Sequence, residues 1–300
     1  MIRPANFGFN AQTAVNNAFQ QNNTDTRTGK QALEEFDSFA GVLVANGLQV
    51  TVVQDTPEPH TPDAFFPNNW ISFHTDGTAI LYPMFAPNRR AERDKHIINK
   101  IMSGFSIKNI IDLSFYEKHN QFLEGTGSMV LDRDNKFAYA CISNRTHPEP
   151  LYDFCTQKKY TPILFHAKDN TGQDIYHTNV MMCIAKEYVV ICMDSIPQEN
   201  DRELLLHSFA ETGKEIIPIS IKQMEQFAGN MLQVVNNSGE PLLIMSSQAY
   251  HALTKIQINK LTGFNRIIHA PLYTIEENGG GSARCMMAEI FLPVKNTAGI

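Results

Sequence analysis

Residues 71–82 read ISFHTDGTAILY, and this stretch is the clearest fold signal in the chain. Two runs of largely apolar residues flank the dipeptide Asp76-Gly77. Asp-Gly between such runs is a strong short-range signal of a β-hairpin, because glycine accepts the positive φ that a tight turn requires. We therefore expect an antiparallel pair of strands here.

Three further hairpins are expected, in residues 128–140, 180–192 and 231–245. Helices are expected at 29–46, 91–103, 148–159, 199–213, 220–228 and 247–254, and a strand at 48–53. A recurring order of hairpin, helix and strand, without an exact repeat, indicates units arranged radially around a centre. Periodicity alone is equally compatible with a two-domain α/β enzyme. Because no stretch resembles an interdomain linker, we expect residues 1–300 to form a single α/β domain.

Composition narrows the class of partner. The 300 residues are 43% hydrophobic, which is enough for a large core. Lys and Arg total 25 against 31 acidic residues, a net charge of −6, and no basic block is present. This distribution disfavours binding to nucleic acid or to an anionic membrane.

The expected localisation is cytoplasmic. The first ten residues contain no apolar segment of signal-peptide length, and no stretch approaches the roughly 20 apolar residues of a membrane span. The 5 cysteines form no C-x-x-C pair, which favours reduced thiols over disulfides or a zinc site. Since the histidines also lack ligand spacing, we expect neither a metal nor an organic cofactor.

A triple glycine, Gly279-Gly280-Gly281, lies shortly before Cys285 and an apolar, strand-like run. Consecutive glycines suit a main chain that takes positive φ or passes close to a ligand. A cysteine just beyond such a loop is accessible to substrate, and its thiolate is a strong nucleophile. A buried structural cysteine beside a tight turn would look similar, so the motif needs a base to become a catalytic site.

Two other polar residues stand directly before hairpin strands. Glu124 precedes Gly125-Thr126-Gly127, and His177 lies where a loop leads into the third hairpin. In a radial repeat, equivalent strand ends converge, which would gather Cys285, His177 and Glu124 as nucleophile, acid/base and orienting carboxylate. The alternative is a turn acid and a surface histidine.

In these motifs the chain resembles the guanidino-group-modifying (amidinotransferase-like) superfamily, which includes arginine deiminase, dimethylarginine dimethylaminohydrolase, succinylarginine dihydrolase and glycine amidinotransferase. The resemblance runs nearly end to end and rests on Glu124 to Gly127, on His177-Thr178-Asn179, and on Gly279 to Cys285. It implies a five-bladed α/β propeller of pseudo-fivefold ββαβ units. It also implies covalent catalysis by Cys285 on the carbon of a guanidine or urea.

The resemblance extends to substrate-binding positions. Asp63 matches an aspartate that holds the substrate's α-ammonium, and Asn68 and Asn69 stand where an acidic pair holds a guanidinium. Arg90, preferred over Arg89, and Arg145 resemble arginines that grip the α-carboxylate.

The departures from the family pattern bear on the substrate. Asn179 stands where deiminases carry a second carboxylate, two residues after the histidine. An amide offers both a donor and an acceptor, as a neutral ureido group does, whereas a buried cation needs negative charge. We therefore expect citrulline to be hydrolysed to ornithine, CO2 and ammonia, with main-chain N–H groups of the loop around Gly280 binding the developing oxyanion.

Several alternatives stay open. An arginine or dimethylarginine hydrolase, an amidinotransferase and a non-catalytic propeller binding module all share the fold that the resemblance implies. Asn10 and Thr13 are candidates for a lid over the site, and the polar loop at 20–28 for a flap. The expected ligand is a free amino acid, and a homodimer is compatible with the sequence.

Overall fold

The computed structural model describes residues 1–21, 27–93 and 95–295. Four three-stranded sheets share one construction, in which an antiparallel pair is extended by a third strand parallel to the second. Their strands are β3 (Ile71–Phe73), β4 (Thr78–Leu81), β5 (Asn109–Asp112); β6 (Val130–Asp132), β7 (Phe137–Cys141), β8 (Thr161–Phe165); β9 (Met182–Ile184), β10 (Tyr188–Ile191), β11 (Glu215–Pro218); and β12 (Leu232–Val235), β13 (Pro241–Ser246), β14 (Arg266–Ala270).

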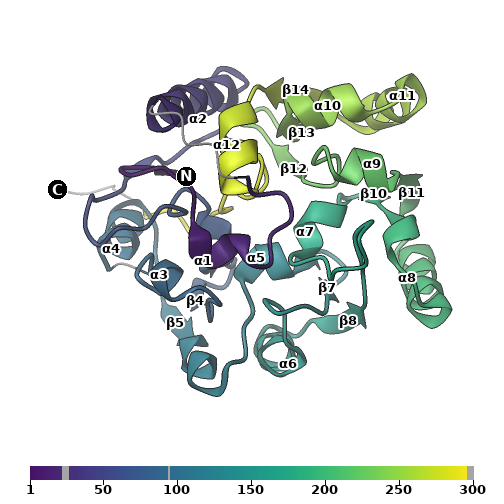
Figure 1. Cartoon of the computed structure of the whole chain (residues 1–300), viewed down its shortest axis with the longest axis horizontal. Helices are drawn as coiled ribbons and strands as arrows, with labels where there is room; N and C mark the ends of the chain where they lie inside the picture. Colours follow the sequence, from purple (N-terminus) through teal and green to yellow (C-terminus); the bar gives the residue numbers. More distant parts are fainter. Residues whose placement is uncertain (22–26, 94, 296–300) are drawn as a thin grey trace.

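Helices connect the second and third strands of each sheet, as a parallel pair requires a crossover. They are α4 (Lys95–Gly104), α6 (Pro148–Lys158), α8 (Glu199–Glu211), and the consecutive α10 (Ser247–Ala252) and α11 (Lys255–Phe264). Figure 1 shows these helices toward the outside of the molecule, with the short α5 (Gly125–Ser128), α7 (Thr178–Met181) and α12 (Tyr273–Gly279) nearer its middle. The result is four ββαβ units in a mixed α/β fold.

A smaller unit joins β1 (Ile2–Arg3) in parallel to β2 (Val53–Gln54), with α2 (Thr28–Ala45) between them. The strand predicted at 48–53 is therefore mostly wrong, since only its last residue belongs to a strand. The remaining short elements are α1 (Ala11–Ala14), α3 (Pro87–Arg90), α9 (Ile221–Met224), and the 3-10 helices η1 (Pro67–Asn69), η2 (Ser114–His119) and η3 (Met193–Ser195).

All four predicted hairpins are confirmed. In the first, Gly77 has a φ of 89°, and the Asp76 carboxylate accepts a hydrogen bond from the Thr78 N–H. The helix predicted at 220–228 covers only α9. The strand-like run after Cys285 is not a strand, because residues 286–292 pair with no strand of the described chain.

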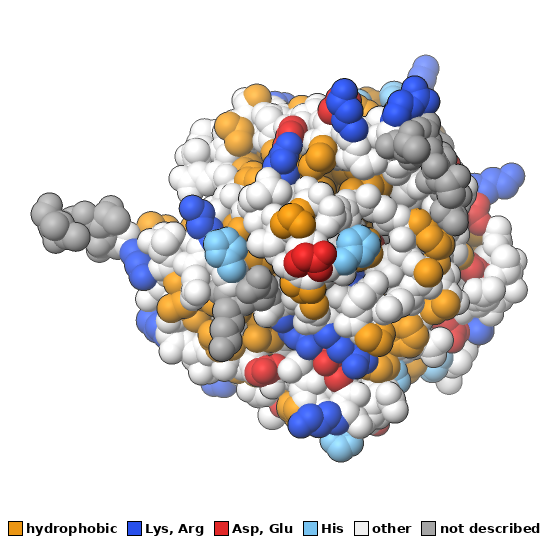
Figure 2. Space-filling view, turned by 60° about the vertical axis from the view of Figure 1, so that its left-hand side comes forward, with side chains coloured by type: hydrophobic (Ala, Val, Ile, Leu, Met, Phe, Trp, Pro, Cys, Tyr) orange, Lys and Arg blue, Asp and Glu red, His pale blue; other side chains and the backbone are white. Residues whose placement is uncertain are grey.

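Apolar side chains of neighbouring units pack together around the middle of the molecule. The largest cluster joins the second, third and fourth three-stranded sheets, and its members include Tyr139, Tyr188 and Phe209. On the face seen in Figure 2, basic, acidic and apolar side chains are interspersed. None of the helices in the described part of the chain has the length and apolar character that crossing a bilayer demands.

Candidate active site

Short helices bring the three predicted catalytic side chains to the middle of the molecule. Glu124 immediately precedes α5, His177 immediately precedes α7, and Cys285 follows the end of α12. All three helices lie toward the centre in Figure 1. The three residues are almost fully buried.

Glu124 and His177 form a hydrogen-bonded pair, with 2.7 Å between Oε2 and Nε2. Burial alone would raise the pKa of Glu124, but the charge of Arg145 and the bond from His177 outweigh it and hold that pKa at about 2. Burial lowers the pKa of His177 to about 4, although Glu124 opposes the shift. Near pH 7 the pair is therefore a carboxylate and a neutral imidazole.

This pairing fixes the tautomer of the imidazole. A carboxylate only accepts hydrogen bonds, so the proton of neutral His177 must lie on Nε2. Nδ1 is then free to accept a proton. A Cβ atom placed on Gly127 would lie 2.8 Å from Nδ1, so this nitrogen sits against the backbone of α5 at a point where only glycine fits.

Cys285 and His177 line the same small cavity, whose volume is about 10 Å³. That is room for about one water molecule. Cys285 is buried, belongs to a cluster of buried apolar side chains, and also borders this cavity. The complete lining is Thr13, Asn17, Asp63, Phe66, Asn69, Arg89, Arg145, Tyr176, His177, Gly279, Gly280, Gly281 and Cys285.

The triple glycine allows a close approach of the chain. Gly280 ends α12 with a φ of 64°, and a Cβ there would lie 2.4 Å from Asn17 Nδ2. The Gly280 carbonyl accepts hydrogen bonds from Asn17 Nδ2 at 3.1 Å and from the Tyr176 hydroxyl at 2.5 Å. Its N–H donates to Glu276 O at 3.0 Å. Gly280 therefore lines the cavity, but its N–H is not free to bind an oxyanion.

Asp63 lies in the cavity wall close to an arginine. Its Oδ2 accepts from Asn10 Nδ2 at 2.8 Å and from Thr13 Oγ1 at 3.1 Å, and lies 3.9 Å from Arg89 Nε. Its Oδ1 is buried with no hydrogen-bond partner among the described residues. Burial raises the pKa of Asp63, with Arg89 the main opposing charge.

The preference for Arg90 over Arg89 finds no support in this geometry. Arg89 lines the cavity, is held by Glu92 through two contacts of 2.9 Å, and donates to Asn69 Oδ1 at 2.7 Å. Arg90 instead donates to the Met84 and Phe85 carbonyls and faces Glu117 at 3.5 Å. Adjacent residues on a helical turn point in different directions, and here the second one points away from the cavity.

Arg145 reaches the cavity, and the N-terminal segment covers it. Its guanidinium donates to Thr13 O at 2.6 Å and to Asn16 Oδ1 at 2.5 Å. It also lies 3.6 Å from Glu124. Asn10 and Thr13 thus cover Asp63 while Thr13 and Asn16 cover Arg145, as expected of a lid. Most of the predicted flap, residues 22–26, lies outside the described residues.

The three asparagines occupy different places. Asn69 lines the cavity, and because its Oδ1 accepts from Arg89, its Nδ2 points elsewhere and has no hydrogen-bond partner among the described residues. Asn179 Nδ2 lies 3.6 Å from Cys285 Sγ. Asn68 is buried and is not part of the cavity lining. Its main-chain carbonyl faces Gly125 and Thr126.

Sequence reasoning missed two residues near Cys285. Asn230 Nδ2 lies 3.3 Å from Cys285 Sγ, and Tyr176 holds the Gly280 carbonyl. A signal for Asn230 existed. It precedes β12, the first strand of the fourth hairpin, as Glu124 precedes β6 and His177 precedes β9.

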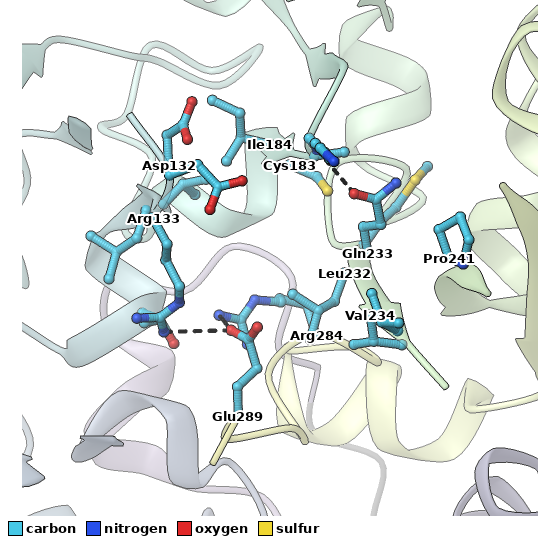
Figure 3. Close-up of a pocket in the computed structure, with 18 of the residues that line it drawn as sticks. Asp132, Arg133, Cys183, Ile184, Leu232, Gln233, Val234, Pro241, Arg284 and Glu289 are labelled. Carbon is cyan, nitrogen blue, oxygen red and sulfur yellow. Dashed lines mark hydrogen bonds and ion pairs between the residues drawn. The ribbon is translucent and has the colours of Figure 1, made fainter. Parts of the chain in front are cut away.

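A second cavity, of about 850 Å³, contains neither Cys285 nor His177 in its lining. Asn179 and Thr126 form part of its wall. Figure 3 shows Arg133 and Arg284 beside Glu289 in this cavity, at 3.6 and 3.5 Å respectively. Within residues 1–21, 27–93 and 95–295, no group of three or more His, Cys, Asp or Glu side chains could hold a metal ion.

Solved structures with this fold include those of ArgZ, of AgrE and of a dimethylarginine dimethylaminohydrolase adduct. The N-terminal domain of ArgZ bound to substrate, an arginine dihydrolase from the ornithine–ammonia cycle in Cyanobacteria, is 16% identical, with a TM-score of 0.74 over 97% of this chain and 98% of that one. AgrE with L-arginine is 18% identical, with a TM-score of 0.75 over 99% of this chain and 40% of that one. A dimethylarginine dimethylaminohydrolase adduct with S-methyl-L-thiocitrulline is 14% identical, with a TM-score of 0.65 over 95% and 96%.

The chain spans about 40% of full-length ArgZ and AgrE. No curated protein matches the sequence. A family model described as N,N dimethylarginine dimethylhydrolase, eukaryotic, matches residues 3–292. The chain therefore belongs to this dimethylarginine dimethylhydrolase family, within the guanidino-group-modifying superfamily.

Proposed function

We propose that the protein hydrolyses the terminal ureido or guanidino carbon of a free amino acid to release ornithine, through a covalent adduct on Cys285. Asp63 binds the α-ammonium, and Arg89 and Arg145 bind the α-carboxylate. The support is that these side chains line one cavity with Cys285 and His177. Paired arginine donors suit a carboxylate, and a buried carboxylate suits an ammonium.

Two buried atoms without partners carry the proposal. Asp63 Oδ1 can only accept a hydrogen bond, and Asn69 Nδ2 can only donate one. A buried polar group without a partner is costly, so a bound ligand that satisfies both gains from the site. An amino acid with a ureido group supplies an ammonium donor for Asp63 and a carbonyl acceptor for Asn69.

The substrate that best fits the free donor, Asn69 Nδ2, is citrulline. A guanidinium has only N–H donors and cannot accept a hydrogen bond from Asn69 Nδ2. Asn179 likewise stands near the sulfur as a neutral amide. A ureido oxygen is therefore a better partner for the amide side of the cavity than a guanidinium.

The chemistry proceeds in two stages. The Cys285 thiol passes its proton to His177 Nδ1, and the thiolate attacks the ureido carbon. His177, oriented by Glu124, returns that proton to the departing ammonia, which leaves a thiocarbamate. His177 then removes a proton from water, which attacks the same carbon and expels the thiolate. The resulting carbamate loses CO2 to give ornithine.

The second candidate substrate is arginine, with the ureido compound as an intermediate. The observation that favours it is the fold shared with ArgZ, an arginine dihydrolase, and with AgrE, solved with L-arginine. In this case Cys285 attacks twice, first on the guanidino carbon and then on the ureido carbon.

The test is to incubate the protein separately with citrulline, arginine and dimethylarginine, and to measure ornithine, ammonia, citrulline and dimethylamine. Citrulline as substrate gives one ammonia per ornithine, and arginine as starting substrate gives two. Cys285→Ala should form none of these products. Citrulline that accumulates from arginine or dimethylarginine, without ornithine, would contradict the proposal.

For the architecture, we propose that the β1–β2 unit is the fifth, reduced blade of a five-bladed propeller and that residues 1–300 form one domain. The support is that α2 connects two parallel strands, as the crossover helices do in the four larger units. Figure 1 places α2 on the outside of the molecule together with α4, α6, α8 and α11.

A further inference from the structure

Asn230 carries a side-chain amide that lies beside Cys285, the predicted nucleophile. Its side chain is fully buried, and Nδ2 lies 3.3 Å from Cys285 Sγ, compared with 3.6 Å for Asn179 Nδ2. Gly229 holds this part of the chain against α7, because a Cβ on Gly229 would lie 2.3 Å from Val180 O. The position of Asn230 relative to the sulfur is therefore set by backbone packing.

The orientation of the Asn230 amide is fixed by a second contact. Its Oδ1 accepts a hydrogen bond from the Arg284 N–H at 3.0 Å. A main-chain N–H only donates, so the oxygen must be on this side and the nitrogen on the other. Nδ2 then has two hydrogens, one directed to Asn179 O at 2.9 Å and one available to the sulfur.

We propose that Asn230 is a catalytic residue that donates a hydrogen bond to the thiolate of Cys285. The proposal rests on the proposed role of Cys285 as nucleophile. It assigns to Asn230 the stabilisation of the charged sulfur before attack, and of the same sulfur when it leaves the thiocarbamate.

The physical reason is the difference between a thiol and a thiolate as acceptors. Neutral sulfur accepts hydrogen bonds weakly, whereas a hydrogen bond to a charged group is substantially stronger. Papain-like enzymes stabilise the thiolate with a charged imidazolium. Here burial lowers the pKa of His177, which disfavours the imidazolium that forms when His177 takes the proton of Cys285. A neutral donor at the sulfur therefore adds stabilisation that this imidazolium supplies only weakly.

The adjacent cation, Arg284, makes its hydrogen bond and its ion pair with groups other than Cys285. The Arg284 guanidinium donates to Met287 O at 2.9 Å and lies 3.5 Å from Glu289. In Figure 3 it faces the larger cavity beside Glu289. The main-chain N–H of Arg284 holds Asn230 Oδ1, and the charge of its guanidinium acts on Cys285 only at longer range.

The experiment measures the rate of Cys285 alkylation by iodoacetamide from pH 5 to 10, with the label assigned to the Cys285 peptide by mass spectrometry. Asn230→Ala removes the donor, and the nearly isosteric Asn230→Asp replaces it with a negative charge. We expect the midpoint of the pH–rate profile to rise by about one unit in the first variant and further in the second. Asn230→Asp keeps the size of the side chain, so it remains informative if Asn230→Ala fails to fold.

Asn265→Ala is the matched control. Asn265 is also a buried asparagine with hydrogen bonds through both side-chain atoms, but it contacts Tyr188 and Leu261 rather than Cys285. Its loss should lower the thermal midpoint and leave the alkylation midpoint unchanged. An unchanged alkylation midpoint in folded Asn230→Asp would overturn the proposal. Because alkylation needs no substrate, that result is distinct from a failure to hydrolyse citrulline or arginine.

Discussion

At the scale of single residues, the site depends on how tightly α5 packs against the imidazole. A Cβ on Gly127 would lie 2.8 Å from His177 Nδ1 and 2.4 Å from Asn69 Nδ2, and the φ of Gly127 is not positive. Gly127→Ala should therefore displace both side chains without straining the backbone, and lower kcat by about 100-fold. Steady-state kinetics of ornithine release test this.

The matched control is Gly41→Ala, where a Cβ would meet nothing within 4 Å. Gly41 lies inside α2, so alanine there should be neutral or slightly stabilising. Equal activity of the two variants would mean that the contact between Gly127 and His177 has no part in catalysis.

The two adjacent arginines give a second residue-scale prediction. Arg89 lines the cavity with Asp63, and Arg90 does not. Arg89→Lys keeps the charge but loses the donors that hold Glu92 and Asn69 beside the cavity, so KM for the amino acid should rise about tenfold, which is about 1.4 kcal/mol. Arg90→Lys should change KM less than about twofold. A larger increase in KM for Arg90→Lys than for Arg89→Lys would mean that Arg90 binds the α-carboxylate of the substrate.

At the scale of elements, the N-terminal segment covers the cavity, which has a volume of about 10 Å³. Because this is too little room for an amino acid, we expect residues 10–20 to move when substrate enters. Asn17 ties this segment to the glycine loop before Cys285, because its Nδ2 donates to the Gly280 carbonyl. Asn17→Ala should therefore increase the rate of Cys285 alkylation about fivefold at high pH, the effect of one hydrogen bond.

An exposed residue of the same segment serves as the control for that prediction. Val15 is 72% exposed, and Val15→Ala should leave the alkylation rate unchanged. If Asn17→Ala and the parent are alkylated equally fast, the segment does not gate the sulfur through this bond.

The helices and strands show which parts of the fold and of the site can be predicted from the sequence. Each hairpin was predictable because a turn signal separated two apolar runs, and Glu124 and His177 were predictable because they stand before such hairpins. Asn230 stands in the same relation to β12 but has no charge to attract notice. The choice between Arg89 and Arg90 depends on the direction of one helical turn, α3, which periodicity cannot give for four residues.

At the scale of the whole molecule, we expect the free energy of unfolding to fall in acid because of one buried histidine. His74 lies away from the cavity, with Nε2 2.9 Å from Ser72 Oγ, and burial lowers its pKa to about 3, below the usual 6.5. Between these pH values His74 is protonated in the unfolded chain but neutral in the folded chain. The contribution of neutral His74 to the free energy of unfolding is therefore fully present above pH 6.5 and is lost as the pH falls toward 3.

Urea unfolding at pH 7 and pH 5 measures this effect. Between these values the parent should lose about 2 kcal/mol of unfolding free energy more than His74→Gln. The surface variant His119→Gln should follow the parent. If His74→Gln loses as much as the parent, the acid sensitivity comes from other groups.

The whole molecule brings residues from distant parts of the chain to one cavity. We propose that Cys285 forms a covalent bond with the substrate there. Rapid acid quench during turnover of citrulline or arginine, followed by mass spectrometry, measures this directly. The Cys285 peptide should gain the mass of the substrate less one ammonia, and Cys285→Ala should yield no adduct and no ornithine. Ornithine released by Cys285→Ala at the parental rate would contradict the account.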